Sequence, residues 1–263
     1  MILRLILLAT VASPAAAADL RDLCPDRPGR LTPACIVDAG HLQIDTGAID
    51  FTHDATTTDV VDTFAAASTA LRYGVTGSLE AVVQWTPYLS VRDRMRGGGV
   101  TTERGVGDVL LGLKQSLLHP DGKGVSIALA PFVTIPTAKA SIGAGKSTQG
   151  LVVAVTVQLP ADFSLGLSPE VDRLPNGGAR GYHASYTMIG GLSRAFGAVT
   201  PGIELAATRD DDPTSRATRV TADAFIAWVP KALPTVQFDV ATYIGLTRDT
   251  PDVEAYIGVS KRF

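Results

Sequence analysis

Apolar side chains recur at every second position from His41 to Phe263. In residues 236–246, for example, Val236, Phe238 and Val240 alternate with residues that are mostly polar or small. A repeat of two is typical of β-strands that have one apolar face. Twelve such segments are found, near residues 41–52, 60–73, 78–92, 107–118, 124–136, 149–159, 163–173, 183–194, 199–209, 216–229, 233–246 and 253–263. The sequence therefore predicts an all-β chain of about twelve antiparallel strands.

The lengths of the segments and of their connections favour a membrane barrel over a soluble sandwich. Most segments have about ten to fifteen residues, which suits a tilted strand that crosses an apolar band about 25 Å tall. Short connections, such as 74–77 and 160–162, alternate with longer ones, such as 93–105 and 137–148. This alternation is typical of a transmembrane up-and-down β-barrel in the bacterial outer membrane, with the short turns in the periplasm.

Charged residues fall mostly on the polar parity of the segments, and only a few near segment ends, chiefly Asp50, Arg194 and Lys261, have the apolar parity. A charge that faces lipid at mid-bilayer costs about 2–4 kcal/mol, so we expect the apolar face outside and the charged face in the lumen. A soluble lipocalin-like barrel reverses the two faces, and parity alone does not separate the two folds. Strand length, loop alternation and outward aromatics at the short-turn ends favour the membrane barrel. These aromatics are Tyr73, Phe163, Trp228 and Phe263.

The lumen is expected to be lined by charged side chains, namely Arg72, Glu80, Asp108, Lys114, Glu170, Glu204, Asp239, Glu254 and Arg262. Four further charges share their parity, namely Asp45, Asp62, Arg92 and Asp223. Acidic residues outnumber basic ones nine to four in the combined set, which disfavours a path for anions. The alternative is that four of them pair with one another as buried braces: Arg72, Glu80, Asp108 and Lys114. Bracing and lining are compatible, and both remain open.

The N-terminal residues predict export and a disulfide. Residues 1–18 have one basic residue, an apolar stretch and a run of alanines, as in a secretory signal peptide. Cys24 and Cys35 then lie in an oxidising compartment, eleven positions apart in a proline-rich stretch, and we expect them to pair. A lipid anchor on Cys24 and a metal site are the alternatives. We expect residues 19–40 to form a periplasmic segment that folds against or into the barrel mouth, and residues 41–263 to form the barrel.

Composition and motifs argue against other classes of protein. A net charge of −3 without a basic cluster argues against nucleic-acid binding. Residues 140–147 have the spacing of a relaxed phosphate loop, but a strand-like run follows where a helix is needed, so we expect an external loop. His183 and Ser185 have the spacing of the pair in outer-membrane phospholipases, yet both have lumen parity. We therefore expect no catalytic residues, no cofactor and no metal site.

Several short motifs resemble one family of outer-membrane transporters. They are Asp26-Arg27-Pro28-Gly29, Gly40-His41-Leu42-Gln43, Leu71-Arg72-Tyr73-Gly74-Val75-Thr76 before Leu79-Glu80, Gly105-Val106-Gly107-Asp108, Gly245-Leu246-Thr247 with Pro251-Asp252, and Gly258-Val259-Ser260-Lys261-Arg262-Phe263. Across nearly the whole mature chain they are similar to the MetA-pathway of phenol degradation family. The ending at Phe263 resembles the signal by which barrels engage the barrel-assembly machinery. The resemblance implies uptake of small molecules, with aromatic or apolar compounds among them.

The sequence thus predicts an outer-membrane channel, in contact with outer-membrane lipids, for passage of an unidentified small molecule. Two alternatives stay open: an outer-membrane hydrolase that acts on lipid, and a structural barrel with a closed lumen.

Overall fold

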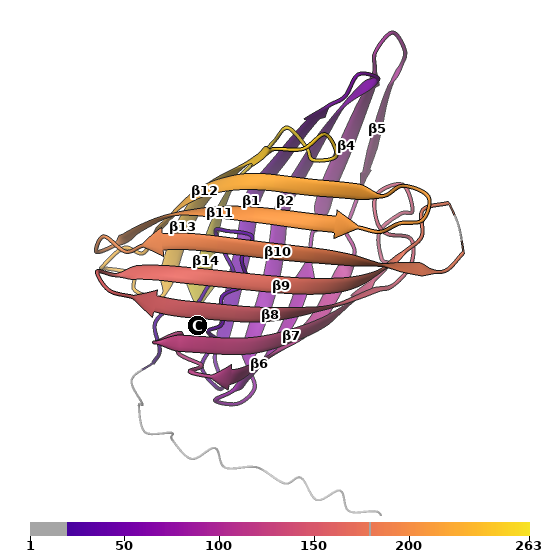
Figure 1. The fold of residues 1–263 in the computed structure, drawn as a ribbon. Coiled ribbons are helices and arrows are strands. Elements are labelled where there is room, and N and C mark those ends of the chain that lie inside the picture. Colours follow the sequence, from indigo (N-terminus) through magenta and orange to yellow (C-terminus); the bar gives the residue numbers. More distant parts are fainter. Residues whose placement is uncertain (1–19, 179) are drawn as a thin grey trace, which may run out of the picture.

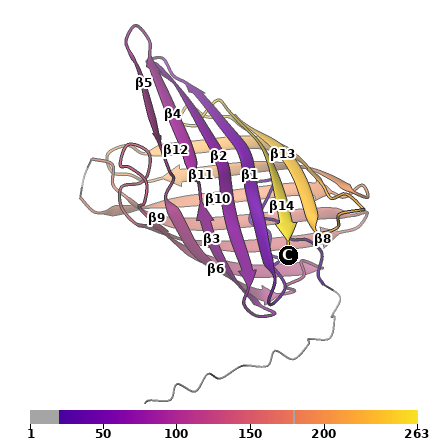
Figure 2. The same cartoon turned by 180° about the vertical axis from the view of Figure 1, so that it is seen from behind.

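The computed structural model describes residues 20–178 and 180–263, so the predicted signal peptide lies outside the described residues. Fourteen β-strands form one sheet (Figures 1 and 2). They are β1 Leu42–Ala55, β2 Asp59–Gly74, β3 Leu79–Trp85, β4 Tyr88–Met95, β5 Val100–Gly105, β6 Val109–Leu118, β7 Val125–Ile135, β8 Thr148–Leu159, β9 Phe163–Pro175, β10 Tyr182–Arg194, β11 Val199–Asp210, β12 Ala217–Trp228, β13 Val236–Gly245 and β14 Val253–Arg262. Within the described ranges, no helix is long and apolar enough to span a membrane.

The sheet closes into an antiparallel barrel because β1 pairs with both β2 and β14. Its wall consists of twelve staves, since β3 and β4 both pair with β2 and make one stave interrupted at Thr86 and Pro87. Proline has no backbone N–H to donate to a ladder, so the break at Pro87 is expected. Likewise β5 and β6 pair with β4 and β3 and make one stave. The predicted twelve-stranded antiparallel barrel is confirmed.

The prediction of a long loop at residues 93–105 is wrong. Most of this segment continues the wall as the hairpin β4–β5, which extends beyond the rest of the barrel together with the adjoining ends of β1 and β2 (Figures 1 and 2). The hairpin reverses at Arg96-Gly97-Gly98-Gly99, where Gly97 has a φ of +83°. Glycine adopts this left-handed conformation without the steric cost that a Cβ would impose. Charged residues on both faces of the hairpin hid its alternation in the sequence.

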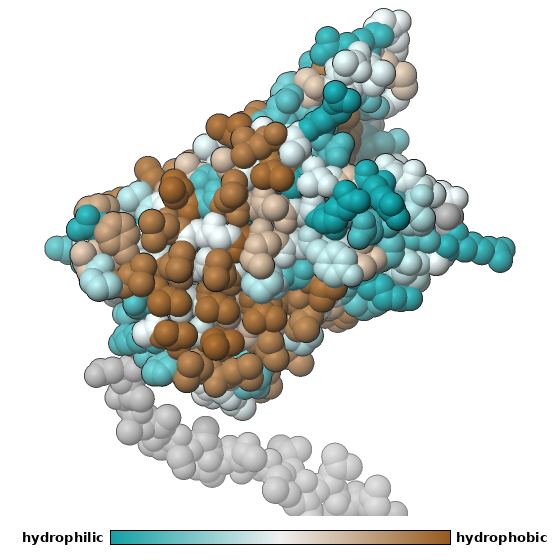
Figure 3. Space-filling model, in the orientation of Figure 1, coloured by the Kyte–Doolittle hydropathy of each residue, from teal (hydrophilic) through white to brown (hydrophobic). Residues whose placement is uncertain are grey.

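The two faces of the barrel have opposite chemistry. Apolar side chains such as Ile203 and Ile257 are at least half exposed on the outside, and Figure 3 shows the apolar band together with the polar long-loop end. Tyr73, Trp228 and Phe263 are also exposed, at 47%, 47% and 58%. The largest fully buried side chains in the described residues include Arg72, Lys114, Gln43 and Glu80. A polar interior and an apolar exterior are expected of a barrel whose solvent is lipid.

An irregularity in β1 and β2 changes the parity of both strands. The register shifts between Gly47 and Ile49, and Ala67 on the paired strand has a φ of +58°. Asp50 consequently lies on the inner face beside Gly47, although its sequence parity predicted the outside. Asp62 lies on the face of exposed Phe64, so its expected lumen position is wrong. A bulge adds one residue without a partner, and sequence alternation cannot register it.

The lumen position expected for Arg92 is likewise wrong. Arg92 pairs directly with Asp62, and cross-strand partners project from the same face of a sheet. Its side chain is therefore on the outer face, in the part of the wall that the β4–β5 hairpin extends.

Candidate functional site

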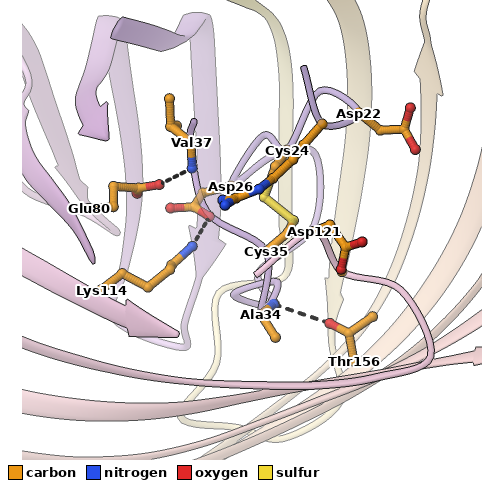
Figure 4. The surroundings of a disulfide bond; sticks show 12 residues. Asp22, Cys24, Asp26, Ala34, Cys35, Val37, Glu80, Lys114, Asp121 and Thr156 are labelled. Carbon is orange, nitrogen blue, oxygen red and sulfur yellow. Dashed lines mark hydrogen bonds and ion pairs between the residues drawn. A yellow bond between two sulfur atoms is a disulfide. The ribbon is translucent and has the colours of Figure 1, made fainter. Parts of the chain in front are cut away.

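The N-terminal segment, residues 20–41, lies inside the barrel and is called the plug below. Its backbone N–H groups donate to side chains from several staves: Arg30 to Glu204 on β11 at 2.7 Å, Thr32 to Ser168 on β9 at 3.1 Å, Ala34 to Thr156 on β8 at 3.1 Å, and Val37 to Glu80 on β3 at 2.8 Å. Figure 4 shows the last two contacts. A segment without helix or strand must find partners for its backbone groups elsewhere. Polar side chains of the barrel wall provide them here.

A disulfide bond joins Cys24 to Cys35 and closes the plug on itself (Figure 4). The predicted pairing is confirmed, and because both sulfurs are in the bond, neither the lipid anchor nor the metal site applies. Ala34, Ile36 and Val37 beside it are almost completely buried, at 0–2% exposure. Proline-rich chain forms few regular backbone hydrogen bonds, so the disulfide and these contacts restrict its conformation instead.

Arg72 on β2 is the centre of the first group of ion pairs. Its side chain is fully buried, with its guanidinium 2.7 Å from Glu80, 3.0 Å from Asp45 and 3.4 Å from Asp26 of the plug. It also donates to the carbonyl oxygen of Cys24. Lys114 on β6 lies 2.7 Å from the other oxygen of Asp26. Buried charges are tolerated when paired and hydrogen-bonded in this way, and the group joins the plug to β1, β2, β3 and β6.

A second group joins the plug to β13 and β14, the strands that adjoin β1 on its other side. Arg27 lies 3.2 Å from Asp239, and its guanidinium carbon is 4.3 Å from the centroid of the Tyr256 ring. Arg30 lies 2.5 Å from Glu254 and stacks over Tyr243 at 4.1 Å. The cations therefore gain both ion pairs and contacts with aromatic faces. In addition, the hydroxyl of Tyr243 donates to the carbonyl of Pro28 at 3.1 Å.

A third contact connects the plug to the last strand. Arg262 on β14 lies 3.2 Å from Asp38 and donates to the backbone oxygen of Arg21 at 2.7 Å. The exposed fraction of the Arg262 side chain is 8%. The plug is thus anchored near both of its ends as well as in its middle.

The remaining expected lumen residues have different surroundings. Asp108 lies between β5 and β6 and accepts from the N–H groups of Ala138 and Ala144, each at 2.9 Å, so it orders the long loop that follows β7. Glu170 on β9 lines two cavities. The suggested mutual bracing is therefore present for Arg72 with Glu80, whereas Lys114 pairs with the plug.

Cavities lie on both sides of the plug. Two on the long-loop side have volumes of about 400 and 250 Å³. The larger is lined by Arg30, Thr187, Thr208 and Glu254 among others, and the smaller by Val82, Leu110, Phe132 and Val152 among others. The third, of about 210 Å³, lies on the short-turn side between the plug residues Pro28, Leu31 and Pro33 and the wall residues Leu192 and Phe225. Plug residues contribute to the lining of all three cavities.

His183 and Ser185 do not form a nucleophilic pair. The Nε2 atom of His183 is 2.8 Å from Asp210, and its Nδ1 atom is 3.0 Å from Asn176. Both ring nitrogens are therefore directed away from Ser185, which is 2% exposed. A nucleophile has to be within hydrogen-bond reach of its base and accessible to substrate. The group instead connects the start of β10 to the end of β11.

Asp212, in the loop after β11, connects two long loops. It accepts from the N–H of Gly177 at 2.7 Å and from the hydroxyl and N–H of Thr214, both at 2.7 Å. These hydrogen bonds stabilise the ionised form, so they lower the pKa of the Asp212 carboxyl to about 2.

The plug residues that pair with the wall were not predicted from the sequence. Asp26, Arg27, Arg30 and Asp38 were not recognised as partners of the lumen charges. A signal was present, since charges of both signs occur in a segment predicted to lie near the barrel mouth.

A closed barrel with an apolar wall and a charged, plugged interior defines the class of outer-membrane β-barrels. Comparison with known proteins places the chain more closely. It belongs to the family described as "Putative MetA-pathway of phenol degradation", whose model matches residues 25–263. Among curated proteins, none matches the chain.

Solved structures share the fold. The COG4313 outer membrane channel from Pseudomonas putida F1 has a TM-score of 0.68 and 14% identity, over 87% of this chain and 97% of that one. The NanC porin has a TM-score of 0.53 and 10% identity, over 84% and 98% of the two chains. The β domain of the Bordetella autotransporter BrkA has a TM-score of 0.53 and 15% identity, over 85% and 99%.

Proposed function

We propose that this chain is a gated outer-membrane channel for small neutral molecules, aromatic or apolar compounds among them, and that the plug is its gate. The observation that carries this proposal is the position of the plug, with a cavity on its short-turn side and two on its long-loop side. Movement of residues 20–41 would join these spaces into one path. The short turns then lie in the periplasm, as in other barrels of this kind.

The nature of the plug's contacts supports a gate. The plug is held mainly by ion pairs and hydrogen bonds, several of them partly exposed, such as Arg30 with Glu254 at side-chain exposures of 31% and 25%. Water can replace such contacts far more readily than it can replace a continuous apolar core. A displaced plug and its lumen partners would both remain solvated.

The cavity linings support the proposed solute class. Phe132, Val82 and Leu110 line one cavity, and Phe225, Leu192 and Leu31 line another. Each cavity exceeds the volume of about 150 Å³ that is known to accommodate benzene in a protein interior. The family description refers to phenol degradation, which suits the same class. The excess of acidic residues facing the lumen disfavours anions.

Two further roles belong to this proposal. The proposal assigns no catalytic role to the one candidate pair, because His183 is already paired with Asp210 and Asn176. The exposed ring of Phe263 is available to the barrel-assembly machinery, while its backbone N–H donates to Leu42 at 2.8 Å and closes the barrel.

Solute entry into vesicles containing the mature protein tests the proposal. Phenol, a neutral sugar and benzoate, offered separately, should enter at decreasing rates, and empty vesicles provide the background for each. Equal rates with and without protein for every solute, including after deletion of residues 20–40, would favour a structural barrel with a closed lumen. Release of fatty acid from the vesicle lipid, abolished by Ser185→Ala, would favour the hydrolase.

A further inference from the structure

The extension of the wall beyond the barrel sorts its charges by face. In one cross-strand row, Phe51, Phe64 and Ser90 align with Arg104; in the next outward row, His53 and Asp62 align with Arg92; and in the third, Val60 aligns with Arg94. Aligned partners project from the same face of a sheet. Because Phe51 and Phe64 are exposed on the outer wall, the three arginines are on the outer face as well.

The opposite face of the same extension is acidic. Glu103 aligns with Val91 and Thr63, and Asp93 aligns with Val61 and Asp54. The outer face has three arginines and one aspartate, and so a charge of +2 with His53 neutral. Successive side chains of a strand point to opposite faces, so basic and acidic residues are separated here by the positions they occupy along the strands.

The outer-face arginines are free to bind a ligand. Arg92 and Arg104 are exposed and make no ion pair within the described residues, and Arg94 contacts Asp62 at 2.6 Å while 39% of its side chain stays exposed. Asp62 also lies 2.7 Å from His53. The single acid on this face is therefore shared, and at least two guanidinium groups have no acidic partner there.

The position of these arginines relative to the bilayer identifies the ligand. Phe64 packs edge-on against Tyr88, with ring centroids 6.2 Å apart, and exposed aromatics of this kind lie at the membrane interface. Arg104 is level with Phe64, Arg92 is one row further out and Arg94 two, with about 6.6 Å between rows along the strands. The guanidinium groups are thus at the height of lipid headgroups on the long-loop side.

We propose that Arg92, Arg94 and Arg104 form a binding site for the phosphate groups of lipid A in the outer leaflet. Guanidinium groups bind phosphate through two parallel N–H donors, and each basic residue near an anionic surface contributes to the attraction. The site holds the β4–β5 hairpin against the headgroups. This inference uses the outer-membrane location in the proposed function, but it does not require that the lumen open.

Binding of defined lipids to the purified, folded protein tests the site. Native mass spectrometry would compare lipid A with two phosphates, its monophosphoryl form and the fully dephosphorylated lipid. Wild-type protein should prefer the diphosphorylated lipid, and Arg92→Gln combined with Arg94→Gln and Arg104→Gln should weaken its binding by about tenfold or more. The matched control replaces three exposed arginines of other long loops, namely Arg180→Gln, Arg216→Gln and Arg248→Gln, and should bind as wild type does.

Two outcomes would overturn the proposal. One is equal binding of phosphorylated and dephosphorylated lipid by the wild-type protein, a result that needs no variant. The other is a triple variant that migrates as a folded barrel in unheated gels and keeps its affinity, or a control that loses as much. The readout is lipid retention, so a failure of solute transport would count against the channel and leave this site intact.

Discussion

Replacing Arg27 and Arg30 with alanine should release the plug while leaving the barrel wall folded. Arg27 pairs with Asp239 at 3.2 Å, and Arg30 pairs with Glu254 at 2.5 Å. Neither arginine belongs to a strand, so no ladder hydrogen bond is lost. The double variant leaves Asp239 and Glu254 inside the lumen without the arginines that neutralise them.

The expected magnitude follows from the contacts removed. A hydrogen bond to a charged group contributes about 1.5–3 kcal/mol, so two such anchors contribute roughly 4 kcal/mol after allowance for partial exposure. Arg27 lies over the ring of Tyr256 and Arg30 over that of Tyr243, and the two tyrosine hydroxyl oxygens are 2.7 Å apart. The effects of losing the two arginines are therefore coupled rather than strictly additive. A change of about 4 kcal/mol raises the ratio of displaced to seated plug roughly a thousandfold.

Two measurements on one preparation test this prediction. Limited chymotrypsin digestion, read by mass spectrometry at Leu31, reports displacement of the plug, and entry of phenol into vesicles reports passage. The control variant, Arg173→Ala with Arg209→Ala, removes two arginines that contact Gln149 and Asp211 rather than the plug. It should match wild type in both measurements.

Two results would contradict this prediction. If digestion at Leu31 rises and phenol entry does not, the plug is displaceable but is no gate. If neither changes in a folded variant, the ion pairs contribute far less than the structure implies.

Three other perturbations have defined outcomes. Replacing Cys24 and Cys35 with serine opens a loop with a sequence separation of 11 and should cost about 3 kcal/mol, seen as earlier digestion of the plug in urea; unchanged digestion would contradict this. Arg72→Met strands buried carboxylates and should lower barrel stability by about 3–5 kcal/mol in denaturant titrations, whereas adding Glu80→Gln should restore part of the loss. Because the pKa of Asp212 is lowered to about 2, its hydrogen bonds to the two loops should persist as the pH falls to 4 and disappear near pH 2. Pepsin at pH 4 should therefore cut these loops in Asp212→Asn and spare the wild-type protein.

The barrel itself was readable from local information. Strand boundaries such as 163–173 and 253–263 lie within two residues of β9 and β14, because alternation of apolar and polar side chains is a property of neighbouring residues. The Cys24–Cys35 pair could also be predicted from the sequence, because only two cysteines occur in the chain. Errors arose where the backbone departs from regular pleating, at Ala67 and in the hairpin after Met95.

The sequence alone thus determined which face of the wall is apolar, how many staves the wall has and that the barrel is closed. An alternation with a period of two, in a lipid solvent, leaves few other solutions. The pairing of charges was decided only by tertiary structure. Arg30 pairs its guanidinium with Glu254 and donates its backbone N–H to Glu204, across 224 and 174 positions of sequence, and nothing near Arg30 in the chain selects these partners. Barrel closure brings distant staves around one short segment, and ion pairs form with whichever charges that geometry places within reach.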